Sequence, residues 1–199
     1  MSNPCKENPV STPKPHLAPL APPYTPELQT LLARMTPPQA PDILALFRVL
    51  AHHPALAEGM TAVGGLLLGR RATLSLRDRE VVIDRVCARC GAEYEWGVHV
   101  AAFAQAAGFS AAQVAAITDP QADDAVLEER DRLLVRLVDE LHDTATVGDA
   151  LWPELASHWS APQLVELLVL AGWYHAISYV CNGARVPLEP WAARWQRPG

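Results

Sequence analysis

Within residues 80–99 lie acidic, thiol and imidazole side chains whose types and spacing could support chemistry. Together, such groups are what proton transfer, thiol redox chemistry or metal binding would each require. Their spacing along the expected helices indicates which of these chemistries is possible. The residues concerned are Glu80, Cys87, Cys90, Glu93, Tyr94, Glu95 and His99.

Glu95 and His99 lie four residues apart on a helix predicted over residues 93–107, so their side chains share one face. A carboxylate in that position orients the ring, fixes its tautomer and raises its pKa, which allows proton transfer near neutral pH. Glu80 lies on the preceding helix, and an antiparallel hairpin about Gly91 would bring it to His99. The alternative is an exposed helical ion pair, which would contribute about 0.3–0.5 kcal/mol.

Cys87 and Cys90 form a CxxC motif, which suggests redox chemistry. The attacking thiol of a redox-active CxxC usually lies at a helix N-terminus, where the helix dipole stabilises the thiolate. Both cysteines instead fall in the last turn of a helix predicted over residues 75–89, so buried structural thiols are the simpler interpretation. A zinc site built from Cys87, Cys90 and His99 would lack a fourth ligand, and we therefore predict no metal site.

The elements that must position these groups are predicted to be all-α, because no window alternates apolar and polar residues as a strand does. Thr25-Pro26 is a typical helix start, and Ser110 and Ser160 each begin a capping box with a glutamine three residues later. The segment 54–68 is apolar on most sides and is expected to be buried. Helices are expected over 42–52, 54–68, 75–89, 93–107, 124–143, 152–158 and 164–180, with a short one from Ser110.

Two segments resemble one another, FSAAQVAAI at 109–117 and WSAPQLVEL at 159–167. This similarity suggests two related helical-hairpin units. Further on, Asn182-Gly183 predicts the end of the last long helix, and the Trp-containing segment 191–195 is expected to anchor onto the domain or onto a partner subunit. His175 is expected to pack in the core or at an interface.

The composition is that of one globular domain, with 199 residues of which 50% are hydrophobic and 19% charged. The net charge of −6 and the scattered basic residues exclude a nucleic-acid footprint, and no apolar run reaches the roughly 18 residues needed to cross a bilayer. The N-terminus lacks the apolar core of a signal peptide, and four dispersed cysteines do not form a disulfide framework. We therefore expect a cytoplasmic protein with reduced thiols and no nucleic-acid or membrane partner.

Proline is concentrated at the N-terminus, where the first 41 residues hold eleven of the 18 prolines. Regular structure is therefore not expected before about Thr25. We predict an extended or disordered Pro-rich arm over residues 1–25 and one helical domain over residues 26–199.

Three separated blocks, RDRE (77–80), CGAEYEWGVH (90–99) and AAGFS (106–110), resemble the carboxymuconolactone decarboxylase and alkylhydroperoxidase-D superfamily. The later block VELLVLAGWYHAISYVCNGARVPLE (165–189) is similar to the C-terminal part of longer members. The resemblance implies an alkylhydroperoxidase-D-like (AhpD-like) helical bundle. It also implies a homo-oligomer, commonly a trimer or a hexamer.

The functional positions of that superfamily fall on Glu80, the acid that closes the RDRE block, and on His99. In the peroxidase branch a CxxC precedes the histidine, and its two cysteine positions correspond here to Ala92 and Glu95. The CxxC of this chain is thus five residues out of register. The resemblance therefore favours the decarboxylase branch, which does not depend on these thiols.

The resulting hypothesis is a cofactor-free enzyme that uses acid–base chemistry on a small carboxylated or lactone-like substrate. In this hypothesis His99 is the general acid or base, Glu95 orients its ring and Glu80 completes the relay. Tyr94 and Trp96 are expected to line the pocket.

Two alternatives stay open from the sequence. The first is a thiol-dependent alkylhydroperoxidase that uses Cys87 and Cys90, or one of them with Cys181, and that needs a thiol of low pKa consumed by hydroperoxide. The second is a non-catalytic oligomeric protein that binds a ligand, in which Glu80 and Glu95 would face bulk water.

Overall fold

The computed structural model describes residues 14–37 and 40–195, and over these residues the protein is all-α, as predicted. Nine α-helices and one 3₁₀ helix are present in the described ranges, with no strand. Their bounds are α1 Pro26–Met35, α2 Ala45–Leu50, α3 Pro54–Leu67, α4 Leu76–Arg89, α5 Glu93–Phe103, α6 Ala111–Thr118, η1 Asp124–Val126, α7 Glu129–Thr144, α8 Leu151–His158 and α9 Ala161–Ala184.

Side-chain caps begin several helices at the predicted positions. The hydroxyls of Thr25 and Ser75 each accept a hydrogen bond from a backbone N–H of the first helical turn. Ser110 and Ser160 form the two predicted capping boxes with the glutamines three residues later. Each bond satisfies a backbone donor that the first turn of a helix leaves without an intrahelical partner.

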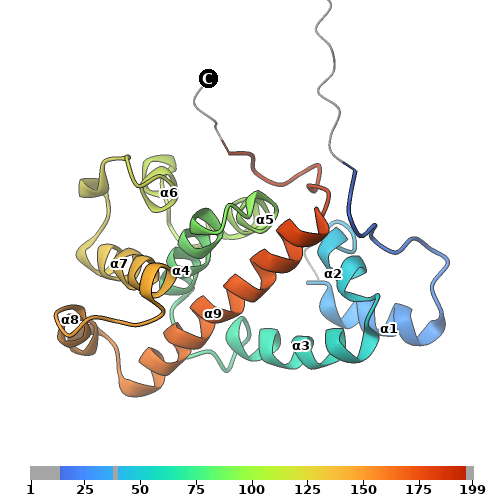
Figure 1. Ribbon diagram of the computed structural model, residues 1–199, viewed down its shortest axis with the longest axis horizontal. Helices are drawn as coiled ribbons and strands as arrows, with labels where there is room; N and C mark the ends of the chain where they lie inside the picture. Colours follow the sequence, from blue (N-terminus) through green and yellow to red (C-terminus); the bar gives the residue numbers. More distant parts are fainter. Residues whose placement is uncertain (1–13, 38–39, 196–199) are drawn as a thin grey trace, which may run out of the picture.

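The helix α9 runs diagonally through the molecule in Figure 1, with α1–α3 on one side of it and α6–α8 on the other. It packs against α2, α4, α5 and α8, and Leu167, Leu170 and Tyr174 are buried in these contacts. In the described part of the chain it is the one helix long and apolar enough to cross a membrane. Its packing is that of the central core helix of the fold.

Two apolar clusters meet at α5. The first fills the space between α4, α6, α7, α8 and α9 and includes Trp96. The second joins α1, α2 and α3 to the C-terminal half of α9 and includes Tyr94 and Val98. Because α5 is covered by both clusters, its polar side chains are held in the interior of the protein.

Two Arg-Asp dipeptides, at 77–78 on α4 and at 130–131 on α7, join these helices. The arginine of each dipeptide forms an ion pair with the aspartate of the other. Arg77 binds the carboxylate of Asp131 through two nitrogens, at 3.1 and 2.6 Å. Arg130 binds the carboxylate of Asp78 in the same way, at 2.8 and 2.7 Å. Bidentate pairs of this kind add geometric specificity to the charge attraction, so they hold α4 and α7 in register.

Each of these arginines also lies over an aromatic ring. The guanidinium carbon of Arg77 is 4.7 Å from the ring centroid of Phe109, and that of Arg130 is 4.1 Å from that of Trp159. Phe109 and Trp159 directly precede the two capping-box serines. The two related units inferred from the sequence thus share an arginine, an aromatic ring and a capping box.

Some helix bounds differ from the prediction for local reasons. α2 begins at Ala45 instead of residue 42, where the carboxylate of Glu189 accepts the Ala45 N–H (2.6 Å). The helix expected over 124–143 is divided, because Asp123 caps the separate turn η1 before α7 begins. α5 ends at Phe103 instead of residue 107, and the chain then turns through Gly108 with φ of +76°.

The predicted helix end at Asn182-Gly183 is wrong. α9 continues to Ala184, and Arg185 then adopts the left-handed conformation with φ of +51°. The side-chain amide of Asn182 donates to the carbonyl of Cys90 (2.8 Å) instead. This bond ties α9 to the C-terminal end of α4.

Residues 14–25 contain no helix and lie against the rest of the chain. The backbone N–H groups of His16 and Leu17 donate to the carbonyl of Ala184, at 2.9 and 3.1 Å. They satisfy an acceptor that the end of α9 leaves without an intrahelical partner. The first part of the predicted arm, residues 1–13, lies outside the described residues.

The helix α3 is more exposed than predicted for the apolar segment 54–68. Only Ala57 and Leu67 of this helix are buried. The prediction of a buried helix is therefore wrong for the single chain. A second copy of the chain over these side chains would fit the expected homo-oligomer, which stays a prediction. The exposed large apolar side chains of α3 and α9 are Leu56, Val63, Leu66, Val165, Val169 and Tyr179.

Replacing Asp78 by asparagine should lower the free energy of unfolding by about 2–3 kcal/mol, because Arg130 then keeps its charge without its partner. Asp78 is only 1% exposed and also accepts the indole N–H of Trp159 (3.1 Å). Urea unfolding followed by circular dichroism measures the loss.

The matched control is Glu154→Gln, which breaks the exposed pair with Arg136. Its cost should stay below about 1 kcal/mol. Equal losses from Asp78→Asn and Glu154→Gln would show that the exchanged pairs do not stabilise the α4–α7 contact.

Candidate active site

The helices α4 and α5 form a hairpin whose turn is set by Gly91. Gly91 has a left-handed backbone with φ of +64°, and the N–H of Ala92 donates to the carbonyl of Cys87 (2.8 Å). This is the Schellman pattern of helix termination, in which glycine avoids the steric cost of a positive φ. The turn folds α5 back along α4 and places His99 against Glu80.

His99 contacts polar side chains from three helices. Its Nδ1 lies 2.7 Å from Oε2 of Glu80 on α4, and its Nε2 lies 3.0 Å from the hydroxyl of Tyr174 on α9. Oε1 of Glu95, one turn earlier on α5, is 3.6 Å from the same Nε2. On the other side of Glu80, Nε of Arg79 donates to Oε1 (3.1 Å). Both ring nitrogens of His99 thus have polar neighbours.

Burial makes the charges of this group interact strongly, because Glu80, His99 and Glu95 are only 1%, 5% and 7% exposed. Desolvation alone would lower the pKa of His99. The charges and hydrogen bonds of Glu80 and Glu95 outweigh that effect and raise the pKa of His99 to about 10. The ring is therefore a cation at neutral pH.

Asp84 is a further acid of this cluster that the sequence analysis did not single out. It lies one turn after Glu80 on α4, is 1% exposed, and its Oδ1 has no hydrogen-bond partner among the described residues. Burial and the negative charge of Glu80 raise the pKa of Asp84 well above its usual range. A neutral Asp84 avoids a third negative charge beside His99. The four-residue spacing from Glu80 was the pattern that could have identified it.

Tyr174 is a second site residue that sequence reasoning missed. The sequence shows it only as part of a polar group on an apolar helix, and no spacing relates it to His99. Burial and the charges of Glu95 and Glu80 raise the pKa of Tyr174 well above its usual range. Tyr174 is therefore a neutral phenol that can both accept and donate a hydrogen bond.

An apolar cavity of about 470 Å³ extends from these side chains. Glu95, His99 and Tyr174 contribute to its wall, whereas Glu80 lies behind the imidazole. A mostly apolar wall with a few convergent polar groups is typical of a site for a small molecule. The apolar lining residues are Met35, Leu44, Leu46, Phe47, Leu50, Met60, Leu68, Val98, Phe103, Trp173 and Ile177.

The two glutamates occupy different places from those predicted. Glu80, and not Glu95, makes the close contact with Nδ1 and so fixes the orientation of the His99 ring. Glu95 lies on the same helical face as His99, as its spacing predicted, but it approaches Nε2 and reaches the cavity. Of the two carboxylates beside His99, Glu95 is the one that lines the cavity.

Tyr94 and Trp96, predicted to line the pocket, lie elsewhere. The hydroxyl of Tyr94 donates to Glu189 (2.7 Å) and accepts the N–H of Leu46 (3.1 Å). The indole N–H of Trp96 donates to the hydroxyl of Thr118 (2.9 Å). The two residues flank Glu95 in the sequence, so on a helix they point into the apolar clusters on either side of the site.

The thiols do not have the environment of redox-active cysteines. Burial and the charge of Glu95 raise the pKa of Cys87, which is 0% exposed, well above its usual range. Burial also raises the pKa of Cys90 and that of Cys181, whose Sγ lies 4.0 Å from Glu95. A raised pKa keeps a thiol protonated and less nucleophilic, which is the opposite of what thiol redox chemistry needs.

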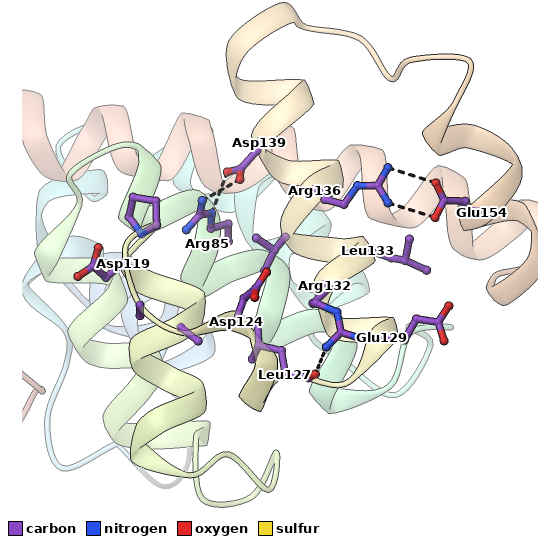
Figure 2. A pocket seen from close by; sticks show the side chains of 14 residues that line it. Arg85, Asp119, Asp124, Leu127, Glu129, Arg132, Leu133, Arg136, Asp139 and Glu154 are labelled. Carbon is purple, nitrogen blue, oxygen red and sulfur yellow. Dashed lines mark hydrogen bonds and ion pairs between the residues drawn. The ribbon is translucent and has the colours of Figure 1, made fainter.

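A second hollow, of about 360 Å³, lies between α6, η1, α7 and α8 (Figure 2). Its wall is charged, but its arginines are already bound. Figure 2 shows Arg85 paired with Asp139 and Arg136 paired with Glu154. Arg132 donates to a backbone carbonyl. None of Glu80, Glu95 and His99 is among the described residues that line this hollow. We therefore assign the candidate active site to the first cavity, which Glu95 and His99 line.

Residues 54–135, which include the whole α4–α5 hairpin, match the Carboxymuconolactone decarboxylase family. This match supports the resemblance to the carboxymuconolactone decarboxylase/AhpD-like superfamily that the motifs indicated. An uncharacterized peroxidase-related protein from Silicibacter sp. TM1040 has the same fold in its crystal structure, with a TM-score of 0.75. The two are 18% identical over 91% of this chain and 96% of that chain. No curated protein matches the sequence significantly. The AhpD-like fold inferred from the motifs is confirmed, and the family resemblance is confirmed over residues 54–135.

The raised pKa of His99 predicts that stability of this AhpD-like protein depends on pH. The folded-state pKa, about 10, lies above the ordinary value of 6.5, so the stabilisation is fully present below about pH 6.5 and is lost as the pH rises through about 10. The free energy of unfolding should therefore fall more steeply between about pH 7 and about pH 10 in the wild type than in His99→Gln. Urea unfolding at several pH values measures both curves, and parallel curves would contradict the charged state assigned to His99.

Proposed function

We propose that this protein is a cofactor-free enzyme that moves protons at a carbon next to a carbonyl group in a small carboxylated or lactone-like substrate. The observation that supports this proposal is the position of His99, whose buried ring lies between two carboxylates at the wall of an apolar cavity. A fixed cation in such a site stabilises the negative charge that develops on a carbonyl oxygen without reorganisation of solvent.

In the proposed reaction His99 is the general acid and Glu95 is the general base. Nε2–H of His99 gives its proton to the carbonyl oxygen while Glu95 takes a proton from the adjacent carbon. The electron pair of the broken C–H bond forms the C=C bond of an enol, and the carbonyl π pair forms the new O–H bond. Where a carboxylate replaces that hydrogen, the C–C bond breaks instead and carbon dioxide leaves.

Glu80 and Tyr174 position the acid. Glu80 holds Nδ1 and favours the charged ring, so Nε2 is the nitrogen that faces the cavity. The hydroxyl of Tyr174 lies 3.0 Å from Nε2 and can accept its proton in a hydrogen bond when no substrate is bound. With substrate in the cavity, the same hydroxyl can donate to the carbonyl oxygen.

The size and lining of the cavity restrict the substrate. A volume of about 470 Å³ with mostly apolar walls suits a compact molecule with few polar groups. Arg34, from the end of α1, also lines the cavity and has an exposed guanidinium that pairs with Glu58 (2.8 Å). A carboxylate on the substrate could replace Glu58 as the partner of Arg34.

The two alternatives have less support. A non-catalytic binding protein would leave Glu80 and Glu95 facing bulk water, but they are 1% and 7% exposed. A thiol-dependent hydroperoxidase would need a thiol of low pKa, whereas burial raises the pKa of Cys87, Cys90 and Cys181.

His99→Gln and Glu95→Gln should each slow turnover by at least about 100-fold, since a positioned general acid or base contributes roughly that much or more. The assay uses a panel of small lactones and unsaturated or 3-oxo carboxylic acids in deuterated water. Proton NMR then reports deuterium uptake next to the carbonyl and loss of the carboxyl group.

The matched control is His158→Gln, which removes an exposed histidine of α8 outside the cavity and should leave the rate unchanged. Circular dichroism verifies that each variant is folded. Wild-type rates in a folded His99→Gln variant would refute the proposed acid. No exchange with any member of the panel would refute the proposed substrate class.

A further inference from the structure

Cys90, His142 and His175 bring three metal-binding atoms together at a place that the proposed reaction does not use. The Cys90 Sγ and one nitrogen from each ring all lie within 4.8 Å of one another. Cys90 caps the C-terminal end of α4, His142 lies in the last turn of α7, and His175 lies within α9. These three residues are not among those that line the cavity at His99.

The ring of His175 is already oriented as a metal ligand would be. Its Nδ1 donates to the carbonyl of Ala171 (3.0 Å), so its Nε2 carries a lone pair. That lone pair faces Nδ1 of His142 at 2.9 Å. A hydrogen bond from the outer ring nitrogen to a carbonyl is the usual support of a metal-bound histidine.

Cys90 is held in place from two sides. The amide of Asn182 on α9 donates to the Cys90 carbonyl (2.8 Å), and the Cys90 N–H donates to Val86 within α4 (2.9 Å). The backbone of Cys90 is therefore fixed at the junction of α4 and α9. A site on rigid helices holds its ligands in a defined geometry.

We propose that Cys90, His142 and His175 bind a zinc ion. In a tetrahedral zinc site with bonds of about 2.0–2.1 Å to nitrogen and 2.3 Å to sulfur, the nitrogens lie about 3.3 Å apart and sulfur lies about 3.6 Å from each. The present separations of 2.9 Å between the nitrogens and at most 4.8 Å overall lie on either side of these values. Small side-chain rotations therefore complete the site. One thiolate and two imidazoles are a ligand set that zinc prefers.

Binding needs no redox partner. The S–H bond of Cys90 breaks, sulfur keeps the electron pair, and the proton leaves to solvent. The proton that lies between the two rings moves to the outer nitrogen of His142, so both facing nitrogens present lone pairs. Water supplies the fourth ligand, as in other zinc sites with three protein ligands.

A zinc ion here would join the ends of α4 and α7 to the middle of α9. His175 directly follows Tyr174, and α4 carries Glu80. The ion would thus stabilise the helices that position the candidate active site without contacting a substrate.

Cobalt titration of the full chain tests the proposal, because a thiolate bound to Co²⁺ gives a charge-transfer absorption band. The Cys5→Ser background removes the thiol that lies outside the described residues. One equivalent of Co²⁺ should produce the band, and Zn²⁺ should displace it. Cys90→Ser should abolish the band, and His142→Gln or His175→Gln should weaken binding by more than about 100-fold.

His158→Gln is the matched control and should bind Co²⁺ like the background protein. Thermal unfolding gives a second measurement, since Zn²⁺ should raise the Tm of the control but not that of His175→Gln. A band that persists in Cys90→Ser, or no band in the control, would overturn the assignment. So would equal zinc-dependent shifts of Tm in the control and in His175→Gln.

Discussion

The contact between Glu80 and His99 is the interaction on which the rest of the site depends. A carboxylate and an imidazolium enclosed by protein are costly unless each has its partner. Here Glu80 binds both Arg79 and His99, and Glu95 approaches the other ring nitrogen. Burial keeps Asp84 neutral, so two negative and two positive charges balance. In the free protein His99 therefore keeps its proton, because losing it would leave the negative charges of the two glutamates with too few positive charges beside them.

The fold is organised so that this group is enclosed but still reaches a cavity. The α4–α5 turn places Glu80 beside Nδ1 of His99, and α9 brings the hydroxyl of Tyr174 to Nε2 of the same ring. The C-terminal segment then covers α5 closely, with the Ala193 N–H donating to the carbonyl of Gly97 (3.0 Å). A Cβ at Gly97 would lie 2.4 Å from the Ala193 carbonyl oxygen, so only glycine permits this crossing.

The sequence predicted what depends on local spacing. The all-α class follows from apolar periodicity. The meeting of Glu80 with His99 follows from a glycine turn and from roughly similar distances to it, 11 and 8 residues, along the two helices. Contacts between distant segments could not be predicted, because packing alone creates them. Tyr174 reaches His99 only through the packing of α9, and the hydroxyl of Tyr94 donates a hydrogen bond to Glu189, which lies far along the chain. The cluster of Cys90 with two histidines has the same origin.

The protonation state of His99 in the free protein tests the central claim most directly. Nitrogen-15 NMR of the imidazole side chains, with the His99 signals assigned by their loss in His99→Gln, shows whether both ring nitrogens carry protons. We predict that both do at about pH 8, and that the second proton leaves only as the pH approaches about 10. A neutral His99 ring at pH 7, with a midpoint near its ordinary 6.5, would contradict the buried ion cluster proposed here.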